Sequence, residues 1–143
     1  MGEPQGEHVL PQIGYLAGVF DLFHVGHLDV LERARAACGR LVVGVLTDEW
    51  AVDAWGARPF VPLVERVQII EHLRAVDEVV VIDDAQVLTG ALVFAADLDG
   101  ILGVDDLSGV AVESLQELPV ARVSRSTILR AAIDQRQSRS SVA

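Results

Sequence analysis

The sequence IGYLAGVFDLFHVGHLDVLERARAA, residues Ile13–Ala37, carries the clearest pattern in the chain. Its first part, Ile13–Phe20, is an apolar run with the length and composition of a buried strand. From about Val25 to Ala37 the apolar residues recur on one face, which is typical of an amphipathic helix. The stretch therefore predicts a strand that turns into a helix, with several polar residues at the turn.

The same alternation of strands and helices continues along the rest of the chain. Apolar runs predict four more strands, and periodic or capped segments predict three more helices. The predicted strands are Leu41–Leu46, Glu78–Ile82, Gly100–Val104 and Pro119–Val123, and the predicted helices are Pro62–Val76, Gln86–Ala96 and Ser124–Gln135, with a loop from 47 to 61. Strands that are apolar throughout and alternate with helices indicate a parallel sheet covered on both faces. We therefore predict an α/β fold: a Rossmann-like, doubly wound sheet of five parallel strands, in one domain of residues 1–135 followed by a polar tail, 136–143.

Charge and composition exclude several classes of partner. The 143 residues carry a formal net charge of −10 and include no lysine, so the basic surface that nucleic acids or anionic membranes require is missing. We therefore expect no nucleic-acid and no membrane partner. The single cysteine, Cys38, fits a reducing compartment and is better explained as a small core residue than as a catalytic thiol. A cytoplasmic location is the expectation.

Two histidines stand where the first strand turns into the first helix. His24 and His27 are three residues apart, so their rings lie on the same side of the first helical turn. The N-terminus of a helix favours an anion, and Gly26 lets a phosphate approach the backbone closely. Asp21, just upstream, is placed to orient a ring or to assist the turn. The motif predicts phosphate binding, the alternative being two histidines that merely cap or pack; His8 and His72 are expected to be structural or solvated.

The segment GVFDLFHVGH, Gly18–His27, resembles the signature of the cytidylyltransferase family. The resemblance continues through LTDEW, RPFVPLVERVQII, RAVDEVV, GVDD and VSRSTI, and so covers nearly the whole chain. It implies transfer of a nucleotidyl group from CTP, with Mg²⁺, to a small phosphate or phosphonate acceptor such as a phosphorylated alcohol, with release of pyrophosphate. It also implies that Gly18, the backbone of Val19 and Phe20, and the segment His24–His27 hold the nucleotide.

The resemblance implies further contacts from three other segments. Arg66 matches an arginine that reaches the triphosphate, the alternative being an exposed arginine paired with Glu65 or Glu71. Gly103 and Asp105 match a segment in which a carboxylate accepts a hydrogen bond from the exocyclic amine of cytosine. The start of the last helix offers a second anion site, formed by Ser124, Arg125, Ser126 and Thr127. Arg125 is predicted to be catalytic, together with His24 and His27.

The chain departs from the family pattern at several positions. Val19 replaces a hydroxyl residue, Asp106 stands where the family has an aromatic residue, and the loop that normally bears lysines offers Arg58 in their place. Two alternatives therefore remain: an adenylyltransferase of the same superfamily, and a nucleotide-binding protein with weak or no catalysis. The segment Arg74–Val80 resembles one at a subunit interface, so a homodimer is expected.

Overall fold

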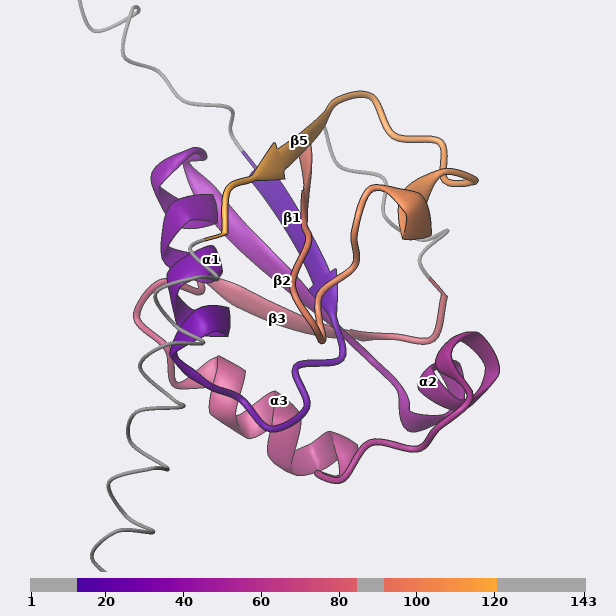
Figure 1. The fold of residues 1–143 in the computed structure, drawn as a ribbon. Helices are drawn as coiled ribbons and strands as arrows, with labels where there is room; N and C mark the ends of the chain where they lie inside the picture. The colour runs from indigo at the N-terminus through magenta and orange to yellow at the C-terminus, as the bar shows by residue number, and fades with distance from the viewer. Residues whose placement is uncertain (1–12, 85–91, 121–143) are drawn as a thin grey trace, which may run out of the picture.

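The computed structural model describes residues 13–84 and 92–120. Within these ranges the chain forms a five-stranded sheet in the order β3-β2-β1-β4-β5, in which all the neighbouring strands run parallel (Figure 1). The elements are β1 (Ile13–Gly18), α1 (Val25–Ala36), β2 (Arg40–Leu46), α2 (Asp48–Trp55), α3 (Leu63–Glu71), β3 (Glu78–Ile82), β4 (Leu92–Ala96), a 3-10 turn η3 (Asp105–Leu107) and β5 (Leu115–Leu118). The predicted Rossmann-like fold is confirmed.

Strand β1 lies at the centre of the sheet, because it pairs with β2 on one side and with β4 on the other. Tyr15 stands level with Val42 of β2 and with Val93 of β4. Since successive side chains of a strand point to opposite faces, a strand in this position must be apolar on both. This requirement explains the unbroken apolar run that begins at Ile13.

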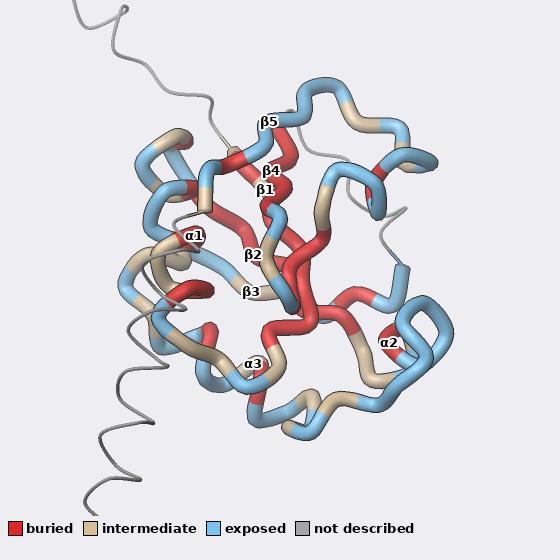
Figure 2. The backbone as a smooth tube through the Cα atoms, in the orientation of Figure 1, coloured by how far each residue is buried: buried red, intermediate tan, exposed pale blue. Residues whose placement is uncertain are grey.

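Two layers of side chains cover the sheet. On one face α1 and α3 contribute Val30, Leu31 and Ile70, which pack with Leu16 and Phe94 of the strands. On the opposite face the core is made by Ala51 of α2 and by the chain from 102 to 112, packed on alternate residues of the same strands. Figure 2 shows that the central strands β1, β2 and β4 are mostly buried and that exposed residues lie on the helices and loops around them. None of the helices in the described ranges is long and apolar enough to cross a membrane.

Two of the sequence predictions are wrong between residues 92 and 104. Residues Leu92–Ala96, expected to end a helix, form strand β4, and every one of them is buried. They are short, apolar and enclosed on both faces, and periodicity alone cannot distinguish such a run from a buried helix. The expected strand Gly100–Val104 is instead part of the loop after β4, where Ile101 makes an isolated antiparallel bridge to Gly18.

The last described strand lies earlier than predicted, and one helix was missed. Strand β5 ends at Leu118, before the predicted strand at Pro119–Val123, of which 121–123 lie outside the described residues, as does the predicted helix Ser124–Gln135. The expected loop from 47 to 61 contains helix α2. Thr47 caps this helix by accepting the Trp50 amide, and Gly56 ends it in the left-handed conformation.

Candidate functional site

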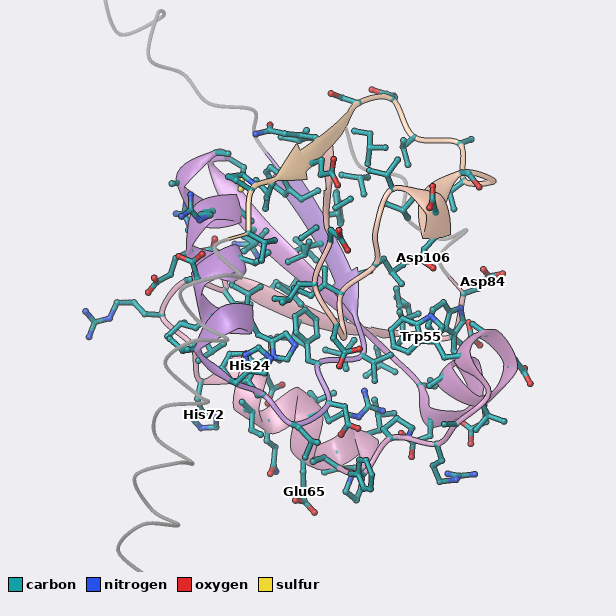
Figure 3. The ribbon with its side chains drawn as sticks, viewed as in Figure 1. His24, Trp55, Glu65, His72, Asp84 and Asp106 are labelled. Atoms are coloured by element: carbon teal, nitrogen blue, oxygen red, sulfur yellow. The ribbon has the colours of Figure 1, made fainter. Side chains whose placement is uncertain are left out.

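The candidate site lies at the carboxyl ends of the parallel strands, where ligands bind in open sheets of this kind. The turn after β1, the start of α1, the loop before α3 and the loop after β4 meet there. Figure 3 shows His24 at the start of α1, with Trp55 and Asp106 on the far side of the strand ends. The structure thus brings together two of the predicted motifs, Gly18–His27 and the segment around Gly103.

His24 caps helix α1. Its Nδ1 accepts a hydrogen bond from the Gly26 amide at 3.0 Å, and its own amide donates to Nδ1 of His27 at 3.1 Å. The two histidines therefore form a capping box, with an imidazole at N3 in the role that Glu or Gln usually has. The sequence left open that the two histidines cap the helix, and both side chains do so. His24 is only half-buried.

His27 is enclosed, with 1% of its surface exposed. Nδ1 accepts the His24 amide, so Nε2 must carry the ring proton, and it donates to the carbonyl oxygen of Asp99 at 2.8 Å. The ring also packs against Phe20 and Phe23, with centroids 5.9 and 5.4 Å away. His27 thus links the start of α1 to a loop 72 residues further along the chain.

The carbonyl oxygen of Gly100 binds the end of β1. It accepts the amides of Val19 and Phe20, at 2.8 and 3.1 Å. Gly100 has φ +90°, and a Cβ added to Gly18 would collide with the Gly100 carbonyl, so both positions require glycine. The Val19 and Phe20 amides, predicted to hold the nucleotide, bind this carbonyl in the structure.

Asp21 joins the turn after β1 to the loop before α3. Its two carboxylate oxygens accept the amides of Phe60 and Val61, both at 2.9 Å. On either side of it, Phe20 and Leu22 have positive φ angles of 54° and 51°, a conformation that costs energy for residues with side chains. Asp21 therefore holds a strained turn in place and fixes the loop that carries Arg58.

Arg66 is a cross-link inside the molecule. Its side chain has no exposed surface; Nη1 donates to the carbonyl oxygens of Val19 and Leu46, Nε donates to that of Val61, and Nη2 forms a salt bridge with Asp48. The alternative of an exposed arginine paired with Glu65 or Glu71 is wrong, because residues distant in sequence enclose it. The phosphate contact stays a prediction, and it would require this side chain to leave its present partners.

Arg58 is exposed beside a hollow of about 160 Å³. Its guanidinium reaches the second oxygen of Asp48 at 3.5 Å, a loose contact that an anionic ligand can replace. The hollow is also lined by Val19, Asp21 and Gly100. Arg58 therefore brings a cation to the end of β1, and its role in place of the missing lysines stays a prediction.

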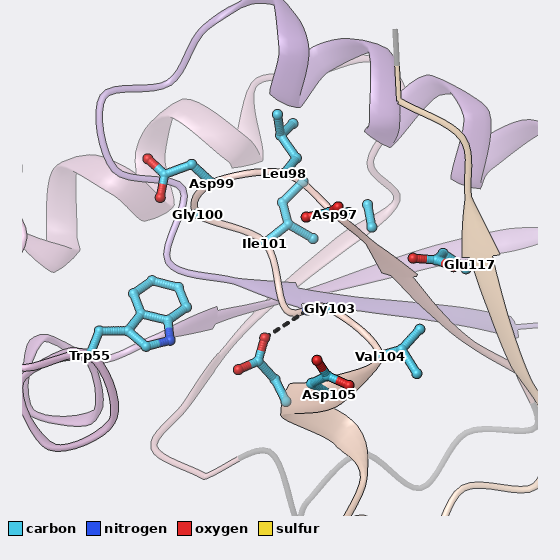
Figure 4. Close-up of a pocket in the computed structure, with 12 residues that line it drawn as sticks. Trp55, Asp97, Leu98, Asp99, Gly100, Ile101, Gly103, Val104, Asp105 and Glu117 are labelled. Carbon is cyan, nitrogen blue, oxygen red and sulfur yellow. Dashed lines mark hydrogen bonds between the residues drawn. The ribbon is translucent and has the colours of Figure 1, made fainter. Parts of the chain in front are cut away.

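A second hollow, of about 450 Å³, lies beyond the ends of β4 and β5 (Figure 4). Trp55 faces it from α2, and its other walls carry five carboxylates: Asp97, Asp99, Asp105, Asp106 and Glu117. Asp106 accepts the Gly103 amide at 2.8 Å, which closes a turn. A wall of carboxylates repels phosphates but accepts hydrogen bonds from amines and hydroxyls.

The remaining predicted positions divide into two groups. Ser124, Arg125, Ser126 and Thr127 lie outside the described residues, and so does His8. His72 is exposed at the end of α3, where Nδ1 contacts the carbonyl oxygen of Gln68, in agreement with a structural or solvated residue. Cys38 is buried in the core, and burial raises the pKa of its thiol, as expected for a packing residue.

Comparison with known proteins identifies the family. The cytidylyltransferase-like family matches residues 15–136, which include the site described above. The chain belongs to the cytidylyltransferase-like family. It is therefore a member of the nucleotidyltransferase superfamily, and the resemblance found in the sequence is confirmed.

The chain is also similar to curated proteins and to a solved structure. The chain is 46% identical over 59 residues to the bifunctional protein HldE of Acidiphilium cryptum, and 57% identical over 37 residues to that of Rhodospirillum rubrum. These matches cover 41% and 26% of this chain but only 12% and 8% of those proteins. The fold is similar to that of a lipopolysaccharide core biosynthesis protein from Thermoplasma volcanium, with a TM-score of 0.58 at 20% identity over 75% of this chain and 95% of that one.

Proposed function

We propose that this chain transfers CMP from CTP to a small phosphorylated alcohol or hydroxyalkylphosphonate and releases pyrophosphate. The observation that carries the proposal is His24 at the start of α1, beside the end of the central strand, in a chain of the cytidylyltransferase-like family. A helix N-terminus and an imidazole there are suited to the charge that develops on a phosphoryl group in transfer.

The distribution of charge supports one orientation of the nucleotide. The small hollow has Arg58 on its wall beside Asp21 and Asp99, whereas the lining of the larger hollow has five carboxylates and no arginine. The two hollows share Trp55, Asp99 and Gly100, so one extended ligand can occupy both. The triphosphate is assigned to the side of His24 and Arg58, and the ribose and base to the acidic side, with Arg125 as a further proposed phosphate ligand.

The acceptor supplies its own nucleophile. An oxygen of its phosphate or phosphonate group, ionised near neutral pH, attacks the α-phosphorus of CTP while the bond to the pyrophosphate oxygen breaks. No strong general base is required, so the chain contributes positioning and charge stabilisation. His24 and Arg58 are the described residues that we assign to the oxygens of the transferred and leaving groups.

Mg²⁺ would enter with the nucleotide. In residues 13–84 and 92–120 no three His, Cys, Asp or Glu side chains are grouped as a metal site. A dedicated cage is not needed, because Mg²⁺ keeps several waters and binds substrate phosphates readily. When bound, the ion would neutralise part of the triphosphate charge in a protein whose net charge is −10.

An adenylyltransferase is the second candidate. The exocyclic amines of cytosine and adenine both donate hydrogen bonds, so carboxylates such as Asp105 suit either base. The segments LTDEW and RAVDEVV favour the cytidylyl branch by resemblance, and we therefore rank CTP first. A sensor without catalysis would bind a nucleotide but release no pyrophosphate.

Pyrophosphate release in the presence of CTP, Mg²⁺ and a panel of phosphate and phosphonate acceptors tests the proposal. We expect acceptor-dependent release that His24→Ala lowers by about 10²-fold, the usual scale for one transition-state donor. His72→Ala, which removes an exposed histidine of α3, is the matched control and should leave the rate unchanged. Equal rates in the two variants would remove His24 from the mechanism.

We also propose a homodimer. Strand β3 is an edge of the described sheet, and Val81 on it is 52% exposed. An uncovered edge that carries apolar side chains is a surface that proteins tend to cover. Light scattering at micromolar concentration is expected to give twice the chain mass, and a monomeric mass would contradict this.

A further inference from the structure

Trp55 is the last residue of α2 and lies at the edge of the site. Gly56 follows it in the left-handed conformation and ends the helix, so the indole leaves the helix at a fixed point. The Trp55 ring packs edge-to-face with that of Trp50, with centroids 5.1 Å apart, and Trp50 in turn packs against the buried core of this face. The indole of Trp55 therefore rests on a rigid support, although 41% of the residue is exposed.

Trp55 lines both hollows of the site. Among the described residues it is the one aromatic side chain that lines the larger hollow, and it also lines the small hollow beside Arg58. Figure 4 shows its indole pointing from the end of α2 toward the segment Gly103–Asp105. A ligand that occupies both hollows therefore passes the Trp55 ring.

The other walls of the larger hollow decide which part of a nucleotide lies against this ring. Among the described residues, its lining has five carboxylates and no arginine, so a phosphate there is repelled and the uncharged part of a nucleotide is favoured. The carboxylates accept hydrogen bonds from hydroxyls and amines at the edges of a ribose and a base, but they offer no flat apolar surface to the face of the base. Trp55 offers that surface, because every base has a π-face on which an indole stacks.

The sequence places a cation close to the same ring. Arg58 follows Trp55 by three positions and lines the small hollow. The end of α2 and the loop after it thus present a stacking surface to the larger hollow and a guanidinium to the small one. A nucleotide presents its base and its phosphates in the same order, so the two residues agree with the orientation proposed above.

We propose that the nucleobase stacks on the indole of Trp55 and that this contact supplies a large share of the affinity for the nucleotide. Stacking tolerates any base, so Trp55 holds CTP and ATP alike, and the choice between them rests on the carboxylates at the edge of the base. The inference rests on the nucleotide binding in the function proposed above and does not require the transfer step.

Calorimetry with CTP and Mg²⁺ tests the stack. We expect Trp55→Ala to weaken CTP binding by about 10- to 100-fold, the scale of one base–aromatic stack, and Trp55→Phe to stay within about 5-fold of wild type. Inorganic tripolyphosphate, which has the phosphates without a base, is the control ligand, and its affinity should be the same in all three proteins. If Trp55→Ala weakens tripolyphosphate binding as much as CTP binding, the residue only shapes the loop of Arg58 and the proposal is overturned.

Fluorescence reports on the ring itself. The chain has two tryptophans, so Trp50→Phe leaves Trp55 as the single reporter. Because a stacked base quenches an indole, we expect CTP to quench Trp50→Phe strongly and Trp55→Phe weakly, and tripolyphosphate to quench neither. Unchanged fluorescence of Trp50→Phe at CTP concentrations that saturate it in calorimetry contradicts the proposal. The calorimetric series does not depend on Trp50→Phe, which alters a residue packed on the core.

The outcomes separate the stack from the transfer reaction. If Trp55→Ala weakens CTP binding and no acceptor releases pyrophosphate with the wild-type chain, the stack stands and the transfer fails. If pyrophosphate is released and Trp55→Ala binds CTP as tightly as wild type does, the stack fails and the transfer stands. A wild-type chain that binds neither CTP nor ATP would overturn both.

Discussion

Asp48, at the first turn of α2, forms a salt bridge with Arg66, a guanidinium with no exposed surface. The pair joins α2 to α3, and Arg66 extends the link to the carbonyl oxygens at the ends of β1 and β2. A buried cation is tolerated only with a counter-charge and well-made hydrogen bonds. The geometry of the strand ends, and so of the site, depends on this pair.

Removing the carboxylate should destabilise the fold. We expect Asp48→Ala to lower the free energy of unfolding by about 3 kcal/mol, because it leaves the Arg66 charge buried without its counter-ion. Asp48→Asn should cost less, since its amide oxygen still accepts a hydrogen bond. Asp29→Ala, which breaks an exposed pair with Arg33 on α1, is the control and should cost about 0.5 kcal/mol or less. Urea unfolding compares the three, and equal losses for Asp48→Ala and Asp29→Ala would contradict the role of the pair.

Asp21 should control the loop that carries Arg58. Asp21→Ala removes the acceptor of both the Phe60 and the Val61 amides, so we expect faster hydrogen exchange at these two amides and weaker CTP binding. The loss of stability should be about 1–2 kcal/mol, as for hydrogen bonds to a partly solvated carboxylate. Asp53→Ala, on the exposed side of α2, is the control. Unchanged exchange at Phe60 in Asp21→Ala would show that another contact holds the loop.

Gly18 should not tolerate a side chain. Gly18→Ala forces a Cβ against the Gly100 carbonyl oxygen, a main-chain atom that cannot move without losing its bonds to Val19 and Phe20. We expect a loss of about 2 kcal/mol or more in unfolding free energy. In Gly103→Ala the new methyl meets its nearest neighbours at 3.7 Å, an ordinary contact, and the change should stay within about 0.5 kcal/mol. Thermal unfolding measures both variants, and Gly18→Ala is expected to unfold at the lower temperature.

Arg58 should matter for catalysis and little for stability. Within the described residues, its one hydrogen bond or ion pair is the loose contact to Asp48, so Arg58→Ala should change the unfolding free energy by less than about 1 kcal/mol. Transition-state stabilisation should fall by about 2 to 4 kcal/mol if the guanidinium binds the phosphates. Arg40→Ala, which breaks an exposed pair with Glu78 at the amino ends of β2 and β3, is the matched control. Steady-state kinetics with unaltered turnover in Arg58→Ala would assign the phosphate charge to other residues.

Local patterns predicted strands β1, β2 and β3 and helices α1 and α3. The run from Ile13 and the helix from Val25 could be located because a central strand is apolar on both faces and an outer helix on one. The run Leu92–Ala96 was assigned to a helix because its type depends on its neighbours: it is a strand because β1 and β5 lie on either side of it. Helix α2 had a local signal, the cap at Thr47 and the glycine at Gly56. It was missed because the tryptophans and the Gly-Ala-Arg-Pro sequence are also typical of a loop.

The site was predicted at the level of segments and less well at the level of side chains. The motif Gly18–His27 lies at the strand ends, as expected. The environments of Arg66 and His27 depend on partners 18 to 72 residues away, such as Asp48 and Asp99, which no local pattern reveals. Such long-range contacts decide whether a charged residue is buried. Periodicity and spacing in a single sequence do not reveal these contacts.

Product identification tests the proposed transfer of a cytidylyl group at this site most directly. The chain is incubated with equal concentrations of CTP and ATP, Mg²⁺, and a mixture of small phosphate and phosphonate acceptors, and the products are identified by mass spectrometry. We predict a CMP–acceptor conjugate that forms with an equal amount of pyrophosphate and is strongly reduced in His24→Ala. An AMP conjugate in excess of the CMP conjugate, or nucleotide binding without any conjugate, would contradict the account.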